Sequence, residues 1–271
     1  MATRLSVAAT HDPQQACRWA VQLEYDGTPF IGWQRQASGR SVQDVLEAAA
    51  ARLTGGRPVA SIVAGRTDAG VHAAGQVAHL DLPLAVSERL TGARLCDALN
   101  FHMKPDPVAV LRAARVGPEF SARFSAIRRS YEYRILNRPA RPALDANRAW
   151  HVRQHLDIAR MQAAAALLVG RHDFSSFRAA SCQARSPVRT LDRLDVTRAG
   201  ESVMLRAEAR SFLHHQIRNL AGTLKLVGDH RWNLEDVAAA LAARDRSQAG
   251  PTAPPQGLCL LAVAYPIDPF A

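Results

Sequence analysis

The chain has 271 residues, of which 48% are hydrophobic and 21% are charged, and it carries a formal net charge of +10. This composition is typical of a folded globular protein; it excludes a long disordered chain, and no apolar run is long enough to span a bilayer. Lysine and arginine number 34 against 24 acidic residues. Such a surplus favours a polyanionic partner, because each neutralised phosphate releases condensed counterions. A genome rich in arginine codons would produce the same surplus, so charge alone leaves both explanations open.

The first 17 residues lack the apolar core and cleavage site of a secretory signal, and we expect them to form a flexible leader. The four cysteines lie far apart in the sequence, at Cys17, Cys96, Cys182 and Cys259. That spacing argues against a zinc site and against a disulfide framework, and it favours a reducing, cytoplasmic environment.

The first half of the chain predicts an alternation of strands and helices. In chain order we expect a strand at 18–25, a helix capped by Ser41 with Asp44 as its capping-box partner and ended by Gly55-Gly56, strands at 59–64 and 75–82 around a polar turn at 65–72, a helix beginning near Ser87, and a strand at 107–116.

The second half repeats this order loosely. We expect a strand around Tyr131–Ile135, a helix capped by Asp157 and running to Gly170, a strand around Leu205–Ala209, a helical stretch from His214 to Val227, a helix opening at Asn233, and a last strand at Leu258–Tyr265. The pattern predicts an α+β fold with a mainly antiparallel sheet flanked by helices, in two similar halves at 18–120 and 121–271. Because no flexible linker separates the halves, we expect them to share a sheet or to pack firmly together.

The most informative segment is Gly65-Arg66-Thr67-Asp68-Ala69-Gly70, which continues to Val77. Its glycines predict a tight loop between strands. Gly65 and Gly70 have the spacing of a phosphate-binding loop, but the lysine and hydroxyl residue that should follow are absent. Two interpretations of Asp68 and Arg66 remain open. They form a local surface ion pair that stabilises the turn, or Arg66 keeps Asp68 ionised so that the carboxylate can act as a nucleophile. No second carboxylate cluster lies nearby, so a site for a hard metal ion is not expected.

The run GRTDAGVHAAGQV at 65–77 resembles the signature of the tRNA pseudouridine synthase A family. Other segments that resemble this family follow in the same order from about residue 18 to 266: EYDGTPFIGWQRQ at 24–36, SVQ at 41–43, FSARF at 120–124, SYEY at 130–133, DFSSF at 173–177, FLHHQIRN at 212–219 and Gly257-Leu258.

The resemblance implies the pseudouridine-synthase fold and an isomerase that converts uridine to pseudouridine in tRNA without an external cofactor. It implies that Asp68 forms a covalent intermediate, and that Arg66 pairs with Asp68 and helps hold open the space left by the extruded uridine. It further implies that Tyr131 packs on the target base and that Leu258 forms an apolar wall of the pocket. Tyr133 is expected in the sheet core.

His214 and His215 raise the question of a metal site. Neighbouring residues of a helix point about 100° apart, so we expect no shared metal ion. We expect instead either a structural contact or contact with the RNA backbone, in which His215 and Arg218 reach phosphates, and we expect Arg35 to be a further RNA contact.

By resemblance, the partner is the anticodon stem-loop of tRNA, modified at nucleotide positions 38–40 by a cytoplasmic homodimer. A non-catalytic RNA-binding protein and a synthase acting on other uridines remain alternatives.

Overall fold

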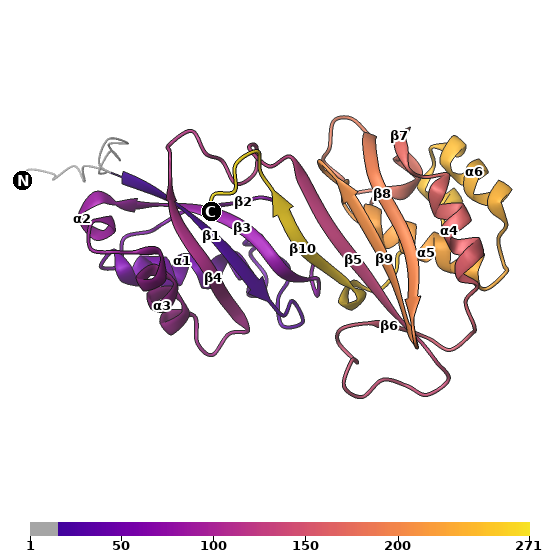
Figure 1. Ribbon diagram of the computed structural model, residues 1–271, viewed down its shortest axis with the longest axis horizontal. Coiled ribbons are helices and arrows are strands. Elements are labelled where there is room, and N and C mark those ends of the chain that lie inside the picture. The colour runs from indigo at the N-terminus through magenta and orange to yellow at the C-terminus, as the bar shows by residue number, and fades with distance from the viewer. Residues whose placement is uncertain (1–15) are drawn as a thin grey trace, which may run out of the picture.

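The computed structural model describes residues 16–271, which form one ten-stranded sheet with helices (Figure 1). The strands are β1 (Ala16–Tyr25), β2 (Ser61–Val63), β3 (His72–Pro83), β4 (Val108–Val116), β5 (Arg128–Asn137), β6 (Trp150–Val152), β7 (Gly170–Asp173), β8 (Val188–Ala199), β9 (Ser202–Ala209) and β10 (Leu258–Ala264). The helices are α1 (Val42–Leu53), α2 (Leu84–Ser87), α3 (Gly92–Met103), α4 (Ile158–Ala166), α5 (Gln216–Gly228) and α6 (Leu234–Ala243), with short 3-10 turns at Ser175–Phe177, Arg246–Gln248 and Pro255–Gly257.

The sheet runs without a break through both halves in the order β4-β1-β3-β10-β5-β9-β8-β7, with β2 beside β3 and β6 beside β5. Its pairs are antiparallel except for β3–β10 and β5–β6. The last strand, β10, lies between β3 and β5 (Figure 1), where Leu260 pairs with Ala73 on one side and with Tyr131 on the other. The predicted α+β fold, its mainly antiparallel sheet and the sharing of that sheet are therefore confirmed. The boundary at residue 120 stays a prediction, since β10 belongs to the second half in sequence and pairs with both.

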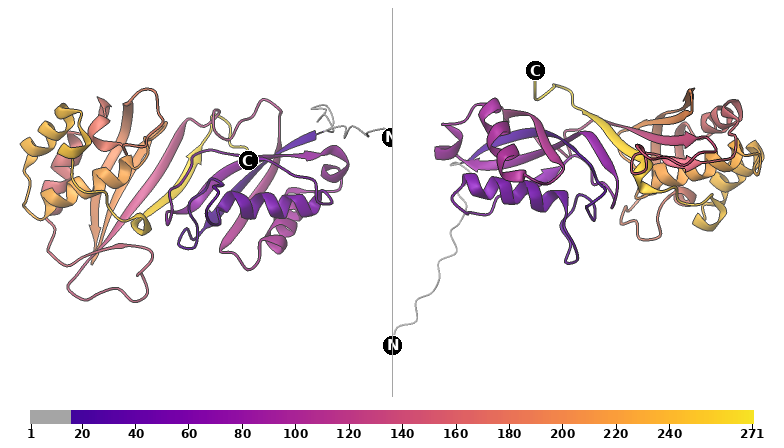
Figure 2. Two further views of the ribbon diagram at one scale, coloured as in Figure 1. Left: turned by 180° about the vertical axis from the view of Figure 1, so that it is seen from behind. Right: turned by 90° about the horizontal axis from the view of Figure 1, so that it is seen from below.

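The helices cover one face of the sheet. Seen from behind, α1 stands in front of the strands of the first half and α5 in front of those of the second (Figure 2). Between the layers lie fully buried large side chains from both halves, including Trp19, Leu46, Leu80, Leu99, Tyr133, Phe174 and Phe177. None of the helices formed by residues 16–271 combines the length and apolar content needed to cross a bilayer.

Helix α5 is the most deeply placed helix of the second half. Every one of its residues except Arg218 is buried. A helix that is buried all round is held by packing on several sides and moves little. The one side chain that escapes burial is therefore held on a rigid support, and it is the side chain that reaches the site described below.

Several predicted helix starts are confirmed by their caps. Ser41 and Asp44 form the reciprocal capping box of α1, and Asn233 and Asp236 form that of α6. The Asp157 side chain accepts a hydrogen bond from the Arg160 backbone at the start of α4. These motifs are local, so the sequence alone was sufficient to place them.

The prediction that a helix begins near Ser87 was wrong. Ser87 instead ends the short α2, and its hydroxyl accepts a hydrogen bond of 3.1 Å from the indole of Trp19. The longer helix α3 starts after Thr91, whose side chain caps it. The first residue of α3 is Gly92, and a glycine is needed there because a Cβ would stand 2.1 Å from the carbonyl oxygen of Ala113.

Further elements differ from the prediction. Strand β3 begins at His72 rather than residue 75, and α4 ends at Ala166 rather than at Gly170. Strands β6, β7 and β8 were not predicted. Most of the predicted leader at 1–17 lies outside the described residues, but Ala16 and Cys17 already belong to β1, where Cys17 pairs with Leu82.

Candidate active site

The loop from Gly65 to Val71 connects β2 to β3 and is supported from within its own half. The hydroxyls of Tyr25 and Thr67 share a hydrogen bond of 2.8 Å, and the Gln76 amide donates to the carbonyl of Gly65 at 2.8 Å. The Trp33 backbone N–H donates to the carbonyl of Thr67 at 3.0 Å. These bonds fix the backbone before Asp68, and the Gly70 N–H, which donates to the carbonyl of Phe30 at 3.3 Å, fixes the backbone after it.

Gly32 allows the segment before α1 to lie directly against this loop. Its φ is +112°, and a Cβ there would stand 2.7 Å from the carbonyl oxygen of Thr67. Gly32 also forms an isolated β-bridge with Asp68. Only glycine combines that dihedral angle with that close approach.

The carboxylate of Asp68 is contacted by three side chains from the second half of the chain. Arg218 Nη1 lies 3.1 Å from Oδ2, His215 Nε2 lies 3.3 Å from Oδ2, and His214 Nε2 lies 3.3 Å from Oδ1. Arg218 is itself oriented by a hydrogen bond of 2.8 Å from its Nε to the carbonyl of Ala253. The Asp68 side chain remains 22% exposed. It is thus a partly accessible carboxylate that lies beside a fixed guanidinium.

The two histidines converge, contrary to the expectation from helix geometry. Helix α5 begins at Gln216, so neither histidine lies within it, and His215 has a left-handed backbone with φ of 61°. Their ring centroids are 4.0 Å apart. The premise that the rings must diverge was wrong.

Asp68, His214 and His215 also form a set whose ligand atoms all lie within 4.8 Å of one another, so they are the described residues best placed to hold a metal ion. The guanidinium of Arg218 against the same carboxylate opposes a second cation there, since like charges repel at this distance.

Burial lowers the pKa of His215, and the neighbouring charge of Arg218 acts in the same direction, while the negative Asp68 opposes both. The net direction favours a neutral imidazole at neutral pH. A neutral ring can donate a hydrogen bond to the carboxylate without forming an ion pair with it.

Tyr131 lies on β5 in the middle of the sheet. It is 8% exposed, and its ring meets Phe212 edge-on at 5.3 Å. Burial raises the pKa of Tyr131, and the charge of Asp68 raises it further, so its hydroxyl stays protonated. On the same face of the strand Tyr133 is fully buried and donates to the carbonyl of Pro254 at 2.7 Å, in agreement with its predicted core position. Leu258 is buried opposite Tyr133 in β10.

Arg66 does not occupy the position expected of it. Its side chain is exposed, and within residues 16–271 it forms neither an ion pair nor a hydrogen bond. The contact with Asp68 that was expected of Arg66 is made by Arg218, which was expected to bind phosphate. Spacing in the loop suggested the first pairing, but the fold brings the second arginine closer.

Arg35 is also engaged elsewhere. Its guanidinium lies 2.5 Å from Asp44 and 2.8 Å from Glu47, both on α1. Two carboxylates therefore balance its charge, and nothing in this arrangement directs Arg35 toward RNA.

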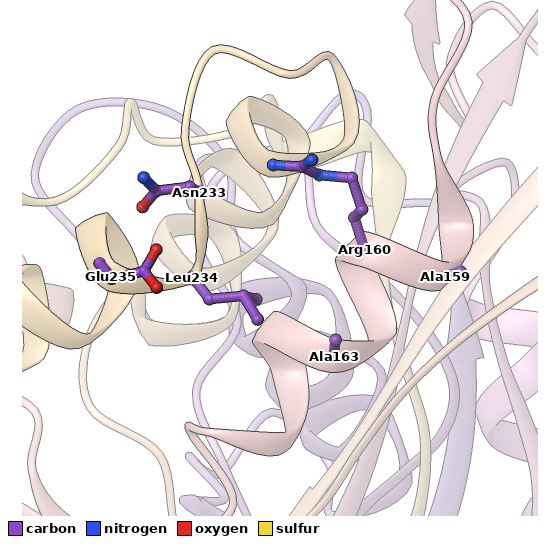
Figure 3. A pocket seen from close by; sticks show the side chains of 6 residues that line it. All are labelled: Ala159, Arg160, Ala163, Asn233, Leu234 and Glu235. Carbon is purple, nitrogen blue, oxygen red and sulfur yellow. The ribbon is translucent and has the colours of Figure 1, made fainter.

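A shallow hollow of about 380 Å³ lies elsewhere, between α4 and α6 (Figure 3). Ala159, Arg160, Ala163, Asn233, Leu234 and Glu235 line it. Asn233 caps α6, and none of these side chains contacts the Asp68 cluster. The chemistry is therefore to be sought around Asp68.

The chain is similar to known proteins over most of its length. The sequence model of the tRNA pseudouridine synthase family matches residues 21–125 and again residues 164–266. The chain belongs to this family. The expected resemblance, and with it an isomerase that acts on tRNA, is confirmed, and the two matched regions agree with two similar halves.

Individual relatives cover nearly the whole chain. A protein of Acidiphilium cryptum (strain JF-5), named tRNA pseudouridine synthase A, is 64% identical over 254 residues, which is 93% of this chain and 98% of the relative. A protein of Gluconobacter oxydans (strain 621H) with the same name is 56% identical over 259 residues, 96% of this chain and 94% of the relative.

Proposed function

We propose that this enzyme isomerises uridine to pseudouridine in the anticodon stem-loop of tRNA, at nucleotide positions 38–40, with Asp68 as covalent nucleophile. The observation that carries the proposal is the convergence of Arg218, His214 and His215 on a partly exposed carboxylate in a glycine-hinged loop. A carboxylate that only stabilised a turn would need no such shell from the other half of the chain.

The reaction rearranges one nucleotide. The bond from ribose C1′ to N1 of uracil breaks, a bond from C1′ to C5 forms, a proton leaves C5 and a proton is taken up at N1. Nothing is added or lost overall, so the chemistry itself needs no cofactor. Asp68 would hold the intermediate by a bond from its oxygen to C1′ or to C6, while Arg218, 3.1 Å from Oδ2, orients the carboxylate for attack.

The reacting base has to leave its stack to reach Asp68. Arg66, which is exposed three residues after Val63 ends β2, is free to occupy the space left in the RNA, since a planar guanidinium stacks as a base does. Tyr131 would pack against the extruded uracil, and Leu258 would contribute to the apolar wall behind it. His215 would approach the RNA at the nucleotide bound by Asp68.

The net charge of +10 supports binding to the phosphates of a folded RNA. An enzyme that recognises an RNA hairpin by its shape and charge can act on many different tRNAs. We place the enzyme in the cytoplasm as a homodimer, which sedimentation of the purified chain would test.

The proposal predicts that Asp68→Asn abolishes pseudouridine formation, by at least about a thousandfold, because the amide lacks the nucleophilic oxygen charge. Purified enzyme would be incubated with unmodified tRNA, and pseudouridine mapped by chemical probing. Binding of the variant to the same tRNA should persist.

Turnover by Asp68→Asn at the normal rate would contradict the catalytic role. If the wild-type chain binds tRNA but makes no pseudouridine at any position, it is a non-catalytic RNA-binding protein. Pseudouridine outside positions 38–40 would instead identify a synthase with another target.

A further inference from the structure

Arg129 in β5 is an arginine on the buried face of a strand. It is 7% exposed and shares that face with Tyr131 and Tyr133, at spacings of two residues. Its terminal nitrogens make four hydrogen bonds, all to backbone carbonyls: Ala64 at 2.6 Å, Arg123 at 2.8 Å, Ala126 at 3.3 Å and Arg210 at 2.5 Å. The guanidinium thus ties the end of β2, the loop at 120–127 and the end of β9 to one point.

The charge of Arg129 is not matched by a carboxylate. Within residues 16–271 Arg129 forms no ion pair, whereas Arg18 and Arg218, for example, each pair with an aspartate. Burial lowers the pKa of Arg129, yet a guanidinium remains protonated at any physiological pH. A buried, uncompensated positive charge is costly for a protein that only needs structural hydrogen bonds.

One donor of this guanidinium remains without an acceptor. The four terminal N–H groups are used by the four carbonyls, whereas the Nε–H makes no hydrogen bond to any described residue. The hydroxyl of Tyr131 likewise has no hydrogen-bond partner in the described part of the chain.

These two groups face the same place. A Cβ on Gly65 would stand 3.9 Å from Arg129 Nε and 3.7 Å from Tyr131 Oη. Gly65 lies three residues before Asp68, whose charge acts on Tyr131. Two unused donors therefore lie beside the loop that carries the nucleophile, at a position kept open by the absence of a side chain.

We propose that Arg129 Nε–H, together with the Tyr131 hydroxyl, binds a carbonyl oxygen of the uracil that is presented to Asp68. The inference rests on the proposed function. It assigns to Arg129 a binding role that its four structural hydrogen bonds do not require. A fixed cationic donor suits a carbonyl oxygen and disfavours an amino group at the same place, so O4 of uracil, which cytosine lacks, is the atom through which this contact would select uridine.

The test replaces single atoms of the substrate. Wild-type enzyme is given three RNA hairpins with uridine, 2-thiouridine or 4-thiouridine at the target position, and kcat/KM for pseudouridine formation is compared. Sulfur accepts hydrogen bonds weakly, so we expect kcat/KM to fall about tenfold or more for 4-thiouridine, the scale of one hydrogen bond to a charged group, and to change little for 2-thiouridine. A loss confined to 2-thiouridine would contradict the assignment to O4. Equal turnover of all three substrates would overturn the proposal.

Arg129→Lys then separates hydrogen bonding from the larger size of sulfur. Lysine keeps the charge but lacks the planar fork that fixes Nε. In this variant the ratio of uridine to thio substrate should fall to about twofold or less, because the contact is already lost for both substrates. A ratio as large as in the wild type would mean that sulfur is excluded by size, and that Arg129 is structural only.

Arg115→Lys is the matched control. Arg115 also donates to backbone carbonyls, those of Ser87 and Leu90, and lies over the Trp19 ring, but it belongs to β4 at the far edge of the sheet. We expect it to lower the melting temperature while leaving the substrate ratio unchanged. If wild-type enzyme makes no pseudouridine at all, the proposed function fails; if it makes pseudouridine without distinguishing the thio substrates, only the role of Arg129 fails.

Discussion

The loop at 64–71 and the segment at 213–218 meet at one carboxylate but are built in opposite ways. The loop is supported by its own half, through Tyr25, Trp33 and Gln76, and it carries Asp68, the proposed nucleophile. The segment at the start of α5 is supported by the core of the other half and carries the groups that contact the Asp68 carboxylate. Because Asp68 lies on one half and its contacts lie on the other, the site depends on strand β10, which pairs with strands of both halves.

The contrast is sharpest between two arginines. Arg66 lies two residues from Asp68 in sequence and does not contact it, whereas Arg218 lies 150 residues away and does. Sequence proximity is therefore a poor guide to which cation controls the carboxylate. Substituting each of the two arginines should therefore change the enzyme's kinetics in a different way.

Arg218→Met is expected to have the largest effect of the variants that keep Asp68. It should lower kcat by about a hundredfold, because it removes the charge held against the reacting carboxylate. Arg66→Met should instead raise KM about tenfold with a smaller change in kcat, because it removes a group available to the RNA. Steady-state kinetics on one tRNA hairpin measures both variants.

A further variant and one contrary outcome test this comparison of Arg218 with Arg66. Arg218→Lys should recover part of the loss in kcat, since it restores the charge without the hydrogen bond to Ala253. The reverse pattern, with kcat controlled by Arg66 and KM by Arg218, would mean that the bound enzyme exchanges the two arginines.

A smaller effect is expected from pH. Because the pKa of His215 is lowered from its ordinary value near 6.5, the ring is neutral at neutral pH and gains a proton only as the pH falls below that value. The protonated ring would pair with Asp68 and withdraw it from reaction, so kcat should fall on the acid side, by about tenfold per pH unit beyond the inflection.

His215→Gln should move this acid limb to lower pH while keeping a hydrogen-bond donor beside Asp68. A pH–rate profile of the variant that superimposes on the wild-type profile would assign the inflection to another group.

The smallest effect is expected from Arg35→Gln. Since Asp44 and Glu47 already balance this guanidinium, its removal should leave tRNA affinity nearly unchanged. The slope of log affinity against log salt concentration is the measurement. A reduction of about 0.7 to 0.9 in that slope would restore Arg35 as a phosphate contact.

Much of the fold was predictable because its signals are local. Ser41 with Asp44, and Asn233 with Asp236, cap their helices through residues three positions apart. The alternation at Tyr131 and Tyr133 correctly predicted a strand. The same alternation places Arg129 on the buried face of that strand, so its burial was also predictable from the sequence. Strand β8 was missed, because an irregularity in its register between Leu191 and Arg193 breaks the two-residue alternation of buried and exposed positions.

The site was predictable only in part. Asp68 could be singled out because it lies in a glycine-rich loop that resembles a family signature. The convergence of His214 and His215 could not be predicted, because it depends on a left-handed backbone at a residue that is not glycine. The pairing of the exposed Arg35 with two carboxylates of α1 depended on how the chain turns at 36–40.

The sequence by itself determined most of the elements, the loop that bears Asp68 and the family to which the chain belongs, since each depends on residues that lie close together along the chain. The tertiary structure decided which cation meets Asp68, how two neighbouring histidines come to face one carboxylate, and which donor of Arg129 stays unused. Those outcomes depend on contacts between segments up to 150 residues apart, and such contacts are set by packing of the shared sheet and not by local propensity.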